Sequence, residues 1–368
     1  MKSHIACIQI IFSVVWINVS LLNSCTKVRK TFNQEDKRLY YSTSFDLSKP
    51  VKESDIVYKT TQVNSLEPTD LVSFQIDQLA ISPFLYISSD TNGNNTLILD
   101  VPQQKIALLF ERAAQELEND NFEEVKNLYQ QAYNIDSLYF KTASNLGDAW
   151  SFLGDYHRAE YYLRKAVQLN DAGYQEYLFL ADVYAKLGKH RDALEAITYA
   201  FMLNKNNPYL LQFLQSVLAK NNLCLNEHRL QFPFRIKKTG VKECEIQYQT
   251  SDDFVWNAMA GCLACWKMEP ELQMKLQGED MLTYKIQMYR QCLLNQGYYL
   301  EDLKNGGKKL TGDEEIFLEK IRKKHVNSIV YWEIMAGEEP YIMFMLSPKE
   351  RQLVVEYIRK YVYQTRVN

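Results

Sequence analysis

Residues 145–169, NLGDAWSFLGDYHRAEYYLRKAVQL, carry a pattern of small and apolar side chains that decides the interpretation of the chain. The pattern returns 34 residues later in residues 179–203, FLADVYAKLGKHRDALEAITYAFML. A more eroded copy stands 34 residues earlier in residues 111–135, ERAAQELENDNFEEVKNLYQQAYNI. A fixed period of this length indicates tandem helical hairpins, of which about three and a capping helix are needed for a stable stack.

Small residues at equivalent positions explain how each hairpin closes. Gly147 and Ala159 stand where two antiparallel helices approach most closely, because larger groups there would push the backbones apart. Gly154 and Gly188 fall between the two helices, where glycine adopts left-handed backbone at little cost. Asp120 takes this turn position in the first copy, which is therefore the least regular of the three.

This pattern resembles the tetratricopeptide repeat (TPR), which implies a mainly α fold, a TPR-type α-α superhelical solenoid. The repeats are expected at 106–139, 140–173 and 174–207, and Pro208 opens an amphipathic helix at 208–220 that suits a cap. The flanks add a small N-terminal β element and a C-terminal, mostly helical module.

The same resemblance implies a binding groove that is lined by the first helix of each repeat. Carried over position by position, its residues here are Phe110, Ala114, Lys141, Ser144, Asp148, Ser151, Gln175, Leu178, Asp182 and Lys186. Some family members grip the terminal carboxylate of a peptide with Lys and Asn at such positions. Asp148 and Asp182 stand where Asn is common, so a carboxylate would meet like charge, and a basic or apolar extended segment is the expected ligand.

The first 24 residues have the features of a secretory signal peptide. A short basic head precedes the apolar stretch 5–22, which is shorter than the ~20 residues that comfortably span a bilayer. Leu22, Ser24 and Cys25 resemble the end of a bacterial lipoprotein signal, in which the cysteine is acylated and becomes the first residue, although Asn23 departs from the usual small residue. An uncleaved anchor and plain secretion are the alternatives. All three place the bulk of the chain outside the cytoplasm.

The flanking regions carry weaker patterns. Residues 25–65 are polar and are interpreted as a tether, and in the region 66–105 the apolar runs 84–87 and 96–99 flank a turn-rich segment that suggests a β-hairpin. The C-terminal module spans 221–368. It is either a separate helical module or a set of badly eroded repeats.

Within the C-terminal module, four local signals are readable. Runs 232–236 and 244–248 around a Thr-Gly pair suggest a short hairpin, and residues 253–267 and 280–296 are expected to form helices. Gly297 is expected to end the second of these helices. Ser347 and Glu350 form a capping box that opens a last helix.

Five cysteines remain after those of the signal and the anchor: Cys224, Cys244, Cys262, Cys265 and Cys292. Cys262 and Cys265 form a C-x-x-C, but no second pair stands at zinc-site spacing. Since the pair falls in the middle of a predicted helix, small buried apolar residues are the favoured interpretation. A disulfide among the five is the alternative, because an exported location permits oxidation.

No motif of known catalytic chemistry occurs in the chain. H-E-x-x-H, G-x-S-x-G, a phosphate-cradling glycine loop and a dinucleotide fingerprint are all missing. A formal net charge of −3 gives no long-range attraction for nucleic acid. We therefore expect no catalytic site, cofactor, metal ion or nucleic-acid partner.

These features together predict a lipid-anchored protein–protein interaction scaffold of the bacterial cell envelope, on the periplasmic side or the cell surface. Its expected partner is an envelope protein or an extended peptide bound in the groove. One alternative is an enzymatic or ligand-binding activity in 221–368, with the repeats as a docking arm. Glycan capture, suggested by the many aromatic residues, is a third interpretation.

Overall fold

The computed structural model describes the repeat region and most of the C-terminal module. The described residues are 55–63, 85–89, 95–99, 102–226, 232–248, 255–278, 281–339 and 341–366. The predicted signal peptide, Cys25 and most of the predicted tether lie outside them. Over these described ranges, no helix combines the length and apolar character needed to cross a membrane.

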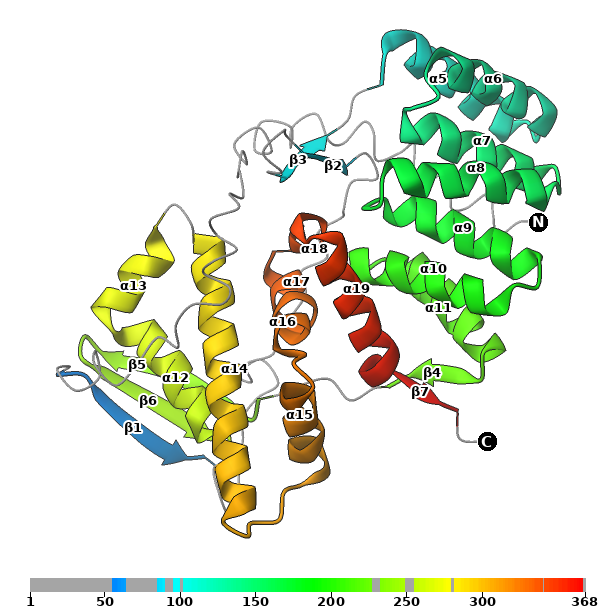
Figure 1. The fold of residues 1–368 in the computed structure, drawn as a ribbon. Coiled ribbons are helices and arrows are strands. Elements are labelled where there is room, and N and C mark those ends of the chain that lie inside the picture. The colour runs from blue at the N-terminus through cyan, green and yellow to red at the C-terminus, as the bar shows by residue number, and fades with distance from the viewer. Residues whose placement is uncertain are drawn as a thin grey trace.

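Stacked helix pairs form the repeat region, at one side of the molecule in Figure 1. The helices are α5 (Gln104–Glu118), α6 (Phe122–Ile135), α7 (Phe140–Phe152), α8 (Tyr156–Leu169), α9 (Tyr174–Lys186), α10 (His190–Leu203) and α11 (Pro208–Lys220). The two helices of each pair pack on each other, and α6, α8 and α10 also pack on the helix that follows them. The predicted α-α solenoid and its capping helix are confirmed.

The turns within the pairs use three residues with left-handed backbone. Gly154 (φ 81°) follows α7 and Gly188 (φ 71°) follows α9, as predicted. Asp120 (φ 56°) has the same conformation after α5. Asp tolerates this region better than most residues that carry a Cβ, because its short polar side chain can bond locally. The first repeat therefore keeps its turn without a glycine.

Gly147 sets how closely α7 and α8 approach each other. A Cβ atom on this residue would lie 2.7 Å from Leu163 Cγ and 3.2 Å from the carbonyl oxygen of Ala159. Both distances are shorter than ordinary van der Waals contacts, so a larger residue would force the helices apart. The predicted close approach of Gly147 and Ala159 is confirmed.

The C-terminal module is mostly helical, as predicted, and includes two π-helical segments, labelled η. Its helical elements are α12 (Asn257–Met268), α13 (Pro270–Gln277), α14 (Met281–Asn305), α15 (Gly312–Arg322), α16 (Val326–Ser328), η1 (Ile329–Met335), α17 (Ala336–Glu338), α18 (Ile342–Met345), α19 (Pro348–Tyr357) and η2 (Ile358–Val362). The capping box at the start of α19 is confirmed, since Ser347 and Glu350 bond each other's backbone N–H groups.

The prediction that Gly297 ends its helix is wrong. α14 continues for two more turns to Asn305. Gly297 is buried, and a Cβ atom there would lie 2.7 Å from Ile321 Cγ2 of α15. The glycine therefore lets α15 pack closely on α14, and it is a contact residue rather than a stop signal.

The predicted tether contains a strand that belongs to the C-terminal module. β1 (Val57–Gln62) pairs in parallel with β6 (Glu243–Tyr248), and β6 pairs antiparallel with β5 (Phe234–Gly240), which confirms the predicted C-terminal hairpin. Tyr58 of β1 also donates a hydrogen bond to Glu269 at 2.5 Å. Residues 57–62 are thus an edge strand of a three-stranded sheet, which corrects the interpretation of 25–65 as a plain tether.

Two further strand pairs bring distant parts of the chain together, one by its contact with a C-terminal helix and the other by its own pairing. β2 (Leu85–Ser89) and β3 (Asn95–Leu99) form the predicted antiparallel hairpin, and its strands contact α18 of the C-terminal module. β4 (Leu223–Leu225), directly after the capping helix, pairs antiparallel with β7 (Tyr363–Thr365) near the end of the chain. The last residues of the module are thereby tied to the end of the solenoid.

The C-terminal module packs on the third repeat, through α18, α19 and η2 against α10 (Figure 1). Arg351 of α19 forms an ion pair with Asp171, and Lys205 donates to the backbone oxygen of Trp332 at 2.5 Å. Phe201 and Trp332 make an edge-to-face ring contact at 5.4 Å. One continuous apolar core runs from α8 through the third repeat into the module, whereas the first repeat and part of α7 have a core of their own.

Candidate functional site

The first helices of the second and third repeats present the predicted groove residues in two parallel stripes. On α7 the positions 141, 144, 148 and 151 recur at helical spacing, and on α9 the positions 175, 178, 182 and 186 do the same. Lys141 and Gln175 occupy the same position in successive repeats, and their side chains are hydrogen-bonded at 3.0 Å. The 34-residue period therefore brings the two stripes side by side.

Three of the predicted groove residues are buried: Lys141, Ser144 and Ser151. Lys141 forms an ion pair at 2.8 Å with Glu176, which is fully buried on α9. A buried charge is tolerated when it is paired and hydrogen-bonded, and both conditions hold for the Lys141 ammonium group. Lys141 thus links the two repeats internally.

The partly exposed members of the two stripes are Asp148, Gln175, Leu178 and Asp182. Asp182 forms an ion pair at 2.6 Å with Lys186, which also donates to Ser151 Oγ at 3.2 Å. The side chains of Lys186 and Asp182 keep 27% and 29% of their area exposed, so this pair remains accessible from solvent. Charged and polar groups of α7 and α9 therefore form one connected surface.

Asp148 has an unusual protonation equilibrium. Desolvation raises the pKa of its carboxyl from 3.8 to about 7, and the negative charge of Asp182 acts in the same direction. Lys186 opposes the shift, because its positive charge favours the ionised form. The predicted groove surface therefore carries one carboxyl group that changes charge near neutral pH.

The first repeat contributes less to this surface. Phe110 and Ala114 of α5 are partly buried, and Phe110 packs edge-on against Tyr129 of α6 with ring centroids 5.7 Å apart. Tyr129 belongs to the core of the first repeat. Phe110 is thus tied to the packing of the first hairpin, and the charged part of the groove lies on α7 and α9.

Glu176 is the residue of this site that the sequence prediction missed. It stands 35 residues after Lys141, one position beyond the repeat period, and is therefore not on the predicted stripe. Its Oε1 accepts a hydrogen bond from the Lys141 ammonium at 2.8 Å, while its Oε2 has no hydrogen-bond partner among the described residues. A search of the sequence for an acidic residue 33 to 35 positions after Lys141, one repeat period give or take one residue, would have found Glu176.

α8, the second helix of the second repeat, carries a separate surface that contains none of the predicted groove residues. His157, Glu160, Tyr161, Arg164, Lys165 and Gln168 line a shallow hollow along α8. Tyr161 is 63% exposed, which makes it a suitable reference position for a surface outside the groove.

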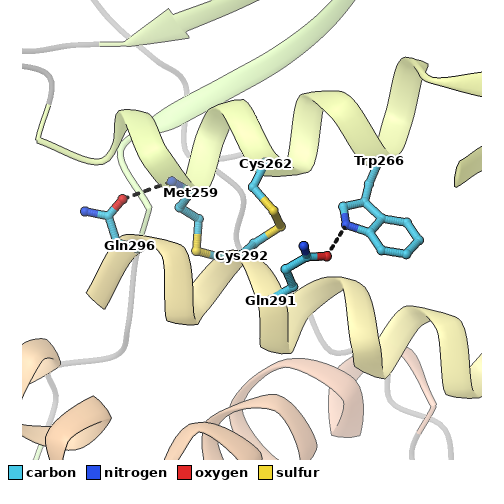
Figure 2. The surroundings of a disulfide bond; sticks show 6 residues. All are labelled: Met259, Cys262, Trp266, Gln291, Cys292 and Gln296. Carbon is cyan, nitrogen blue, oxygen red and sulfur yellow. Dashed lines mark hydrogen bonds between the residues drawn. A yellow bond between two sulfur atoms is a disulfide. The ribbon is translucent and has the colours of Figure 1, made fainter. Parts of the chain in front are cut away.

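A disulfide joins α12 to α14 in the C-terminal module. Figure 2 shows Cys262 and Cys292 facing each other between the two helices, with their Cα atoms 5.3 Å apart. Gln296 accepts a hydrogen bond at 2.9 Å from the backbone N–H of Met259, close to this bridge. The favoured interpretation of Cys262 as a small apolar residue is wrong, because its partner stands on another helix that the sequence does not place next to it.

The C-x-x-C pair itself is not bridged. Cys224, Cys244 and Cys265 are free thiols, and burial raises the pKa of Cys244 and Cys265. Within the described ranges, no group of three or more His, Cys, Asp or Glu side chains is arranged to hold a metal ion.

A second charged cluster lies inside the C-terminal module, around η1. Glu333 of η1 accepts hydrogen bonds from Lys320 at 3.2 Å and from Tyr357, which is fully buried. The rings of His325, Tyr357 and Tyr361 pack against one another in a cluster. Burial lowers the pKa of His325, and the positive charges of Lys360 and Lys320 add to this effect.

Solved structures of TPR domains match about a third of this chain. The first TPR domain of Spaghetti bound to an HSP90 peptide is 21% identical over 33% of this chain and 96% of that chain, with a TM-score of 0.31. The Sgt2 TPR domain from Aspergillus fumigatus is 17% identical over 33% and 82%, with a TM-score of 0.32. The type III secretion translocator chaperone SycD from Yersinia enterocolitica is 15% identical over 33% and 89%, with a TM-score of 0.31. No protein-family model and no curated protein matches the chain.

Proposed function

We propose that the chain is a protein–protein interaction scaffold that binds an extended segment of a partner along α7 and α9. The observation that carries this proposal is the pair of stripes on these helices, where polar and apolar side chains from successive repeats form one partly exposed surface. An extended chain suits such a surface, because helices repeated at a fixed distance offer equivalent contacts at regular intervals. In this proposal the chain acts by binding and catalyses no reaction.

The proposal includes export and a lipid anchor on Cys25 in a bacterial cell envelope. The Leu22–Cys25 ending of the apolar N-terminal stretch supports the anchor. The disulfide between Cys262 and Cys292 supports an oxidising compartment, since disulfides persist mainly outside the cytoplasm.

Metabolic labelling with a radioactive fatty acid tests the anchor. Cys25→Ser removes the thiol that would be acylated, so the protein should lose the label. Ser24→Ala, which keeps a small residue before the cysteine, is the control and should remain labelled. A wild-type protein without label, or a Cys25→Ser protein that keeps it, would contradict lipid anchoring.

Charge reversal tests the groove. The full chain with Asp148→Lys and Asp182→Lys should lose the partners that the wild-type protein retains when it is purified from its own cells, as quantified by mass spectrometry. The control carries Asp192→Lys and Glu271→Lys, two exposed acids outside the groove, and has the same change of net charge. Partner recovery that is equal for the groove variant and the wild type would overturn the proposal.

One observation favours a second candidate, a ligand-binding or enzymatic role of the C-terminal module. The Lys320–Glu333–Tyr357 cluster is built around a π-helical segment, and such segments occur frequently at functional sites. Glu333→Gln would remove its charge while leaving the groove intact. Loss of partner recovery in this variant, with no effect of the Asp148 and Asp182 substitutions, would favour the second candidate.

A further inference from the structure

Asp148 is a charged group without a partner. Among the described residues, no side chain or backbone group donates a hydrogen bond to its carboxylate, and no Lys or Arg lies within ion-pair distance. Buried and half-buried carboxylates are ordinarily paired or hydrogen-bonded. Within the described part of the chain, the fold therefore supplies no partner for the Asp148 carboxylate.

A second unpartnered group stands next to it. Ser144 lies one helical turn before Asp148 on the same stripe of α7, and it is fully buried. Its Oγ has no hydrogen-bond partner in the part of the chain that the structure describes. The spacing of four residues puts Asp148 and Ser144 on the same face of α7. The carboxylate of Asp148 and the hydroxyl of Ser144 are thus neighbouring groups on one face of α7, and neither has a partner among the described residues.

The charges around this place are unbalanced. Asp182 and Lys186 face Asp148 from α9, and Tyr129 faces it from α6. Lys186 is already engaged by Asp182 at 2.6 Å and by Ser151 at 3.2 Å. The two carboxylates of Asp148 and Asp182 therefore have only the ammonium group of Lys186 between them. When both carboxylates are ionised, these three side chains carry a net charge of −1.

We propose that Asp148 and Ser144 form a subsite for a cationic side chain, so that the partner segment presents a Lys or Arg to α7. This inference rests on the proposed groove function and names the chemistry of its ligand. The ammonium or guanidinium group would donate a charge-assisted hydrogen bond to Asp148, the stronger class of hydrogen bond, and would complete the charge balance with Lys186 and Asp182. A carboxylate ligand would instead add a third negative charge.

The protonation of Asp148 makes this subsite sensitive to pH. Its carboxyl has a pKa of about 7, because burial and the charge of Asp182 both disfavour the anion. The ionised fraction falls about tenfold between pH 8 and pH 6, and binding of a cation should fall in proportion. Protonated Asp148 retains only a neutral acceptor.

Selection from random peptides tests the inference without a known partner. The full exported chain is exposed at pH 8 to random twelve-residue peptides displayed on phage, and bound phage are eluted at pH 6. Selected peptides should be enriched in Lys or Arg. Replacing the critical Lys by Gln in the best peptide should weaken its binding about tenfold at pH 8 and hardly at pH 6, as measured by fluorescence anisotropy.

Three variants of the protein locate the effect. Asp148→Asn should bind the best peptide about tenfold more weakly at pH 8 and lose the pH dependence. Asp182→Asn removes the like charge that raises the pKa of Asp148, so the loss of binding should move to lower pH. Asp192→Asn, an exposed acid on α10, is the matched control and should behave as the wild type.

The outcomes separate this inference from the groove proposal. Peptides that bind the wild type but not the Asp148→Lys, Asp182→Lys variant, without enrichment of basic residues, would overturn the cation subsite and leave the groove standing. Peptides that bind both proteins equally would overturn the groove as well. Basic peptides whose affinity is unchanged by Asp148→Asn would also refute the subsite.

Discussion

At the scale of single residues, Asp148 couples the stability of the helix stack to pH. Its pKa is raised to about 7 in the folded chain, well above the usual 3.8. The folded state therefore binds more protons than the unfolded state between about pH 4 and pH 7. The free energy of unfolding contributed by this group must fall as the pH rises through that window, because ionising Asp148 is costly only in the folded state.

Urea denaturation of the wild type and of Asp148→Asn at pH 5 and pH 8 measures this coupling. The wild type should lose more stability on going from pH 5 to pH 8 than the variant does, since the amide does not titrate. Equal pH dependence in the two proteins would show that the carboxyl of Asp148 is not perturbed in the folded state.

Gly147 offers a second prediction at this scale. Gly147→Ala places a Cβ atom 2.7 Å from Leu163 Cγ, so overpacking should lower the free energy of unfolding by about 1–3 kcal/mol. The control is Gly261→Ala in α12, where nothing lies within 4 Å of the added atom and alanine should stabilise the helix by up to ~1 kcal/mol. Thermal unfolding followed by circular dichroism gives both values. A neutral Gly147→Ala substitution would contradict the close approach of α7 and α8.

The residues of the groove could be predicted only in part. Asp148, Asp182 and Lys186 were predicted for the groove because the resemblance to the repeat family assigns these positions to it. The burial of Lys141 was not predicted, since it depends on Glu176, which is one residue out of register with the repeat. Local spacing does not reveal a partner on the neighbouring helix.

At the scale of secondary-structure elements, the disulfide holds α12 to α14. The bridged cysteines are 30 residues apart, and closing a loop of this length stabilises the folded chain by about 3–4 kcal/mol. The double substitution Cys262→Ser, Cys292→Ser should cost about that much in urea denaturation, whereas Cys265→Ser should cost less because its thiol is free. Peptide mapping without reductant should recover a peptide that links Cys262 to Cys292; a Cys262–Cys265 link would contradict the structure.

The strand β1 supplies another prediction for an element. Tyr58→Phe removes the donor to Glu269, which is only 3% exposed, so the cost should be about 1–3 kcal/mol. Tyr298→Phe is the matched control, because Tyr298 is 66% exposed. Chemical denaturation checks both variants. Equal stability of the two would indicate that β1 does not dock through Tyr58.

The sequence predicts elements well where their signals are local. The repeat helices, the two hairpins and the capping box of α19 follow from short-range patterns and are present. The parallel pairing of β1 with β6 joins residues 186 positions apart, such as Val57 and Glu243, and no local pattern announces it. Gly297 was misread because a glycine that ends a helix and one that admits a neighbouring helix look alike in a sequence.

At the scale of the whole molecule, the third repeat and the C-terminal module share one apolar core. Their shared core and the β4–β7 pairing tie the module to α10 and to the end of α11, and the Arg351–Asp171 ion pair ties it to the loop between α8 and α9. The predicted groove lies on α7 and α9, whereas the module packs on α10. The contacts of the module with the stack are therefore concentrated on a helix that does not carry the predicted groove residues.

Site-specific photo-crosslinking in the producing cells tests the central claim, binding along α7 and α9, most directly. Benzoylphenylalanine replaces Leu178, which is partly exposed in the groove, or Tyr161 on the outer face of α8 as the reference. A discrete protein adduct is expected at position 178 that disappears with Asp148→Lys and Asp182→Lys, and no such adduct is expected at position 161. An adduct at position 161 alone, or one at position 178 that survives the charge reversal, would contradict this claim.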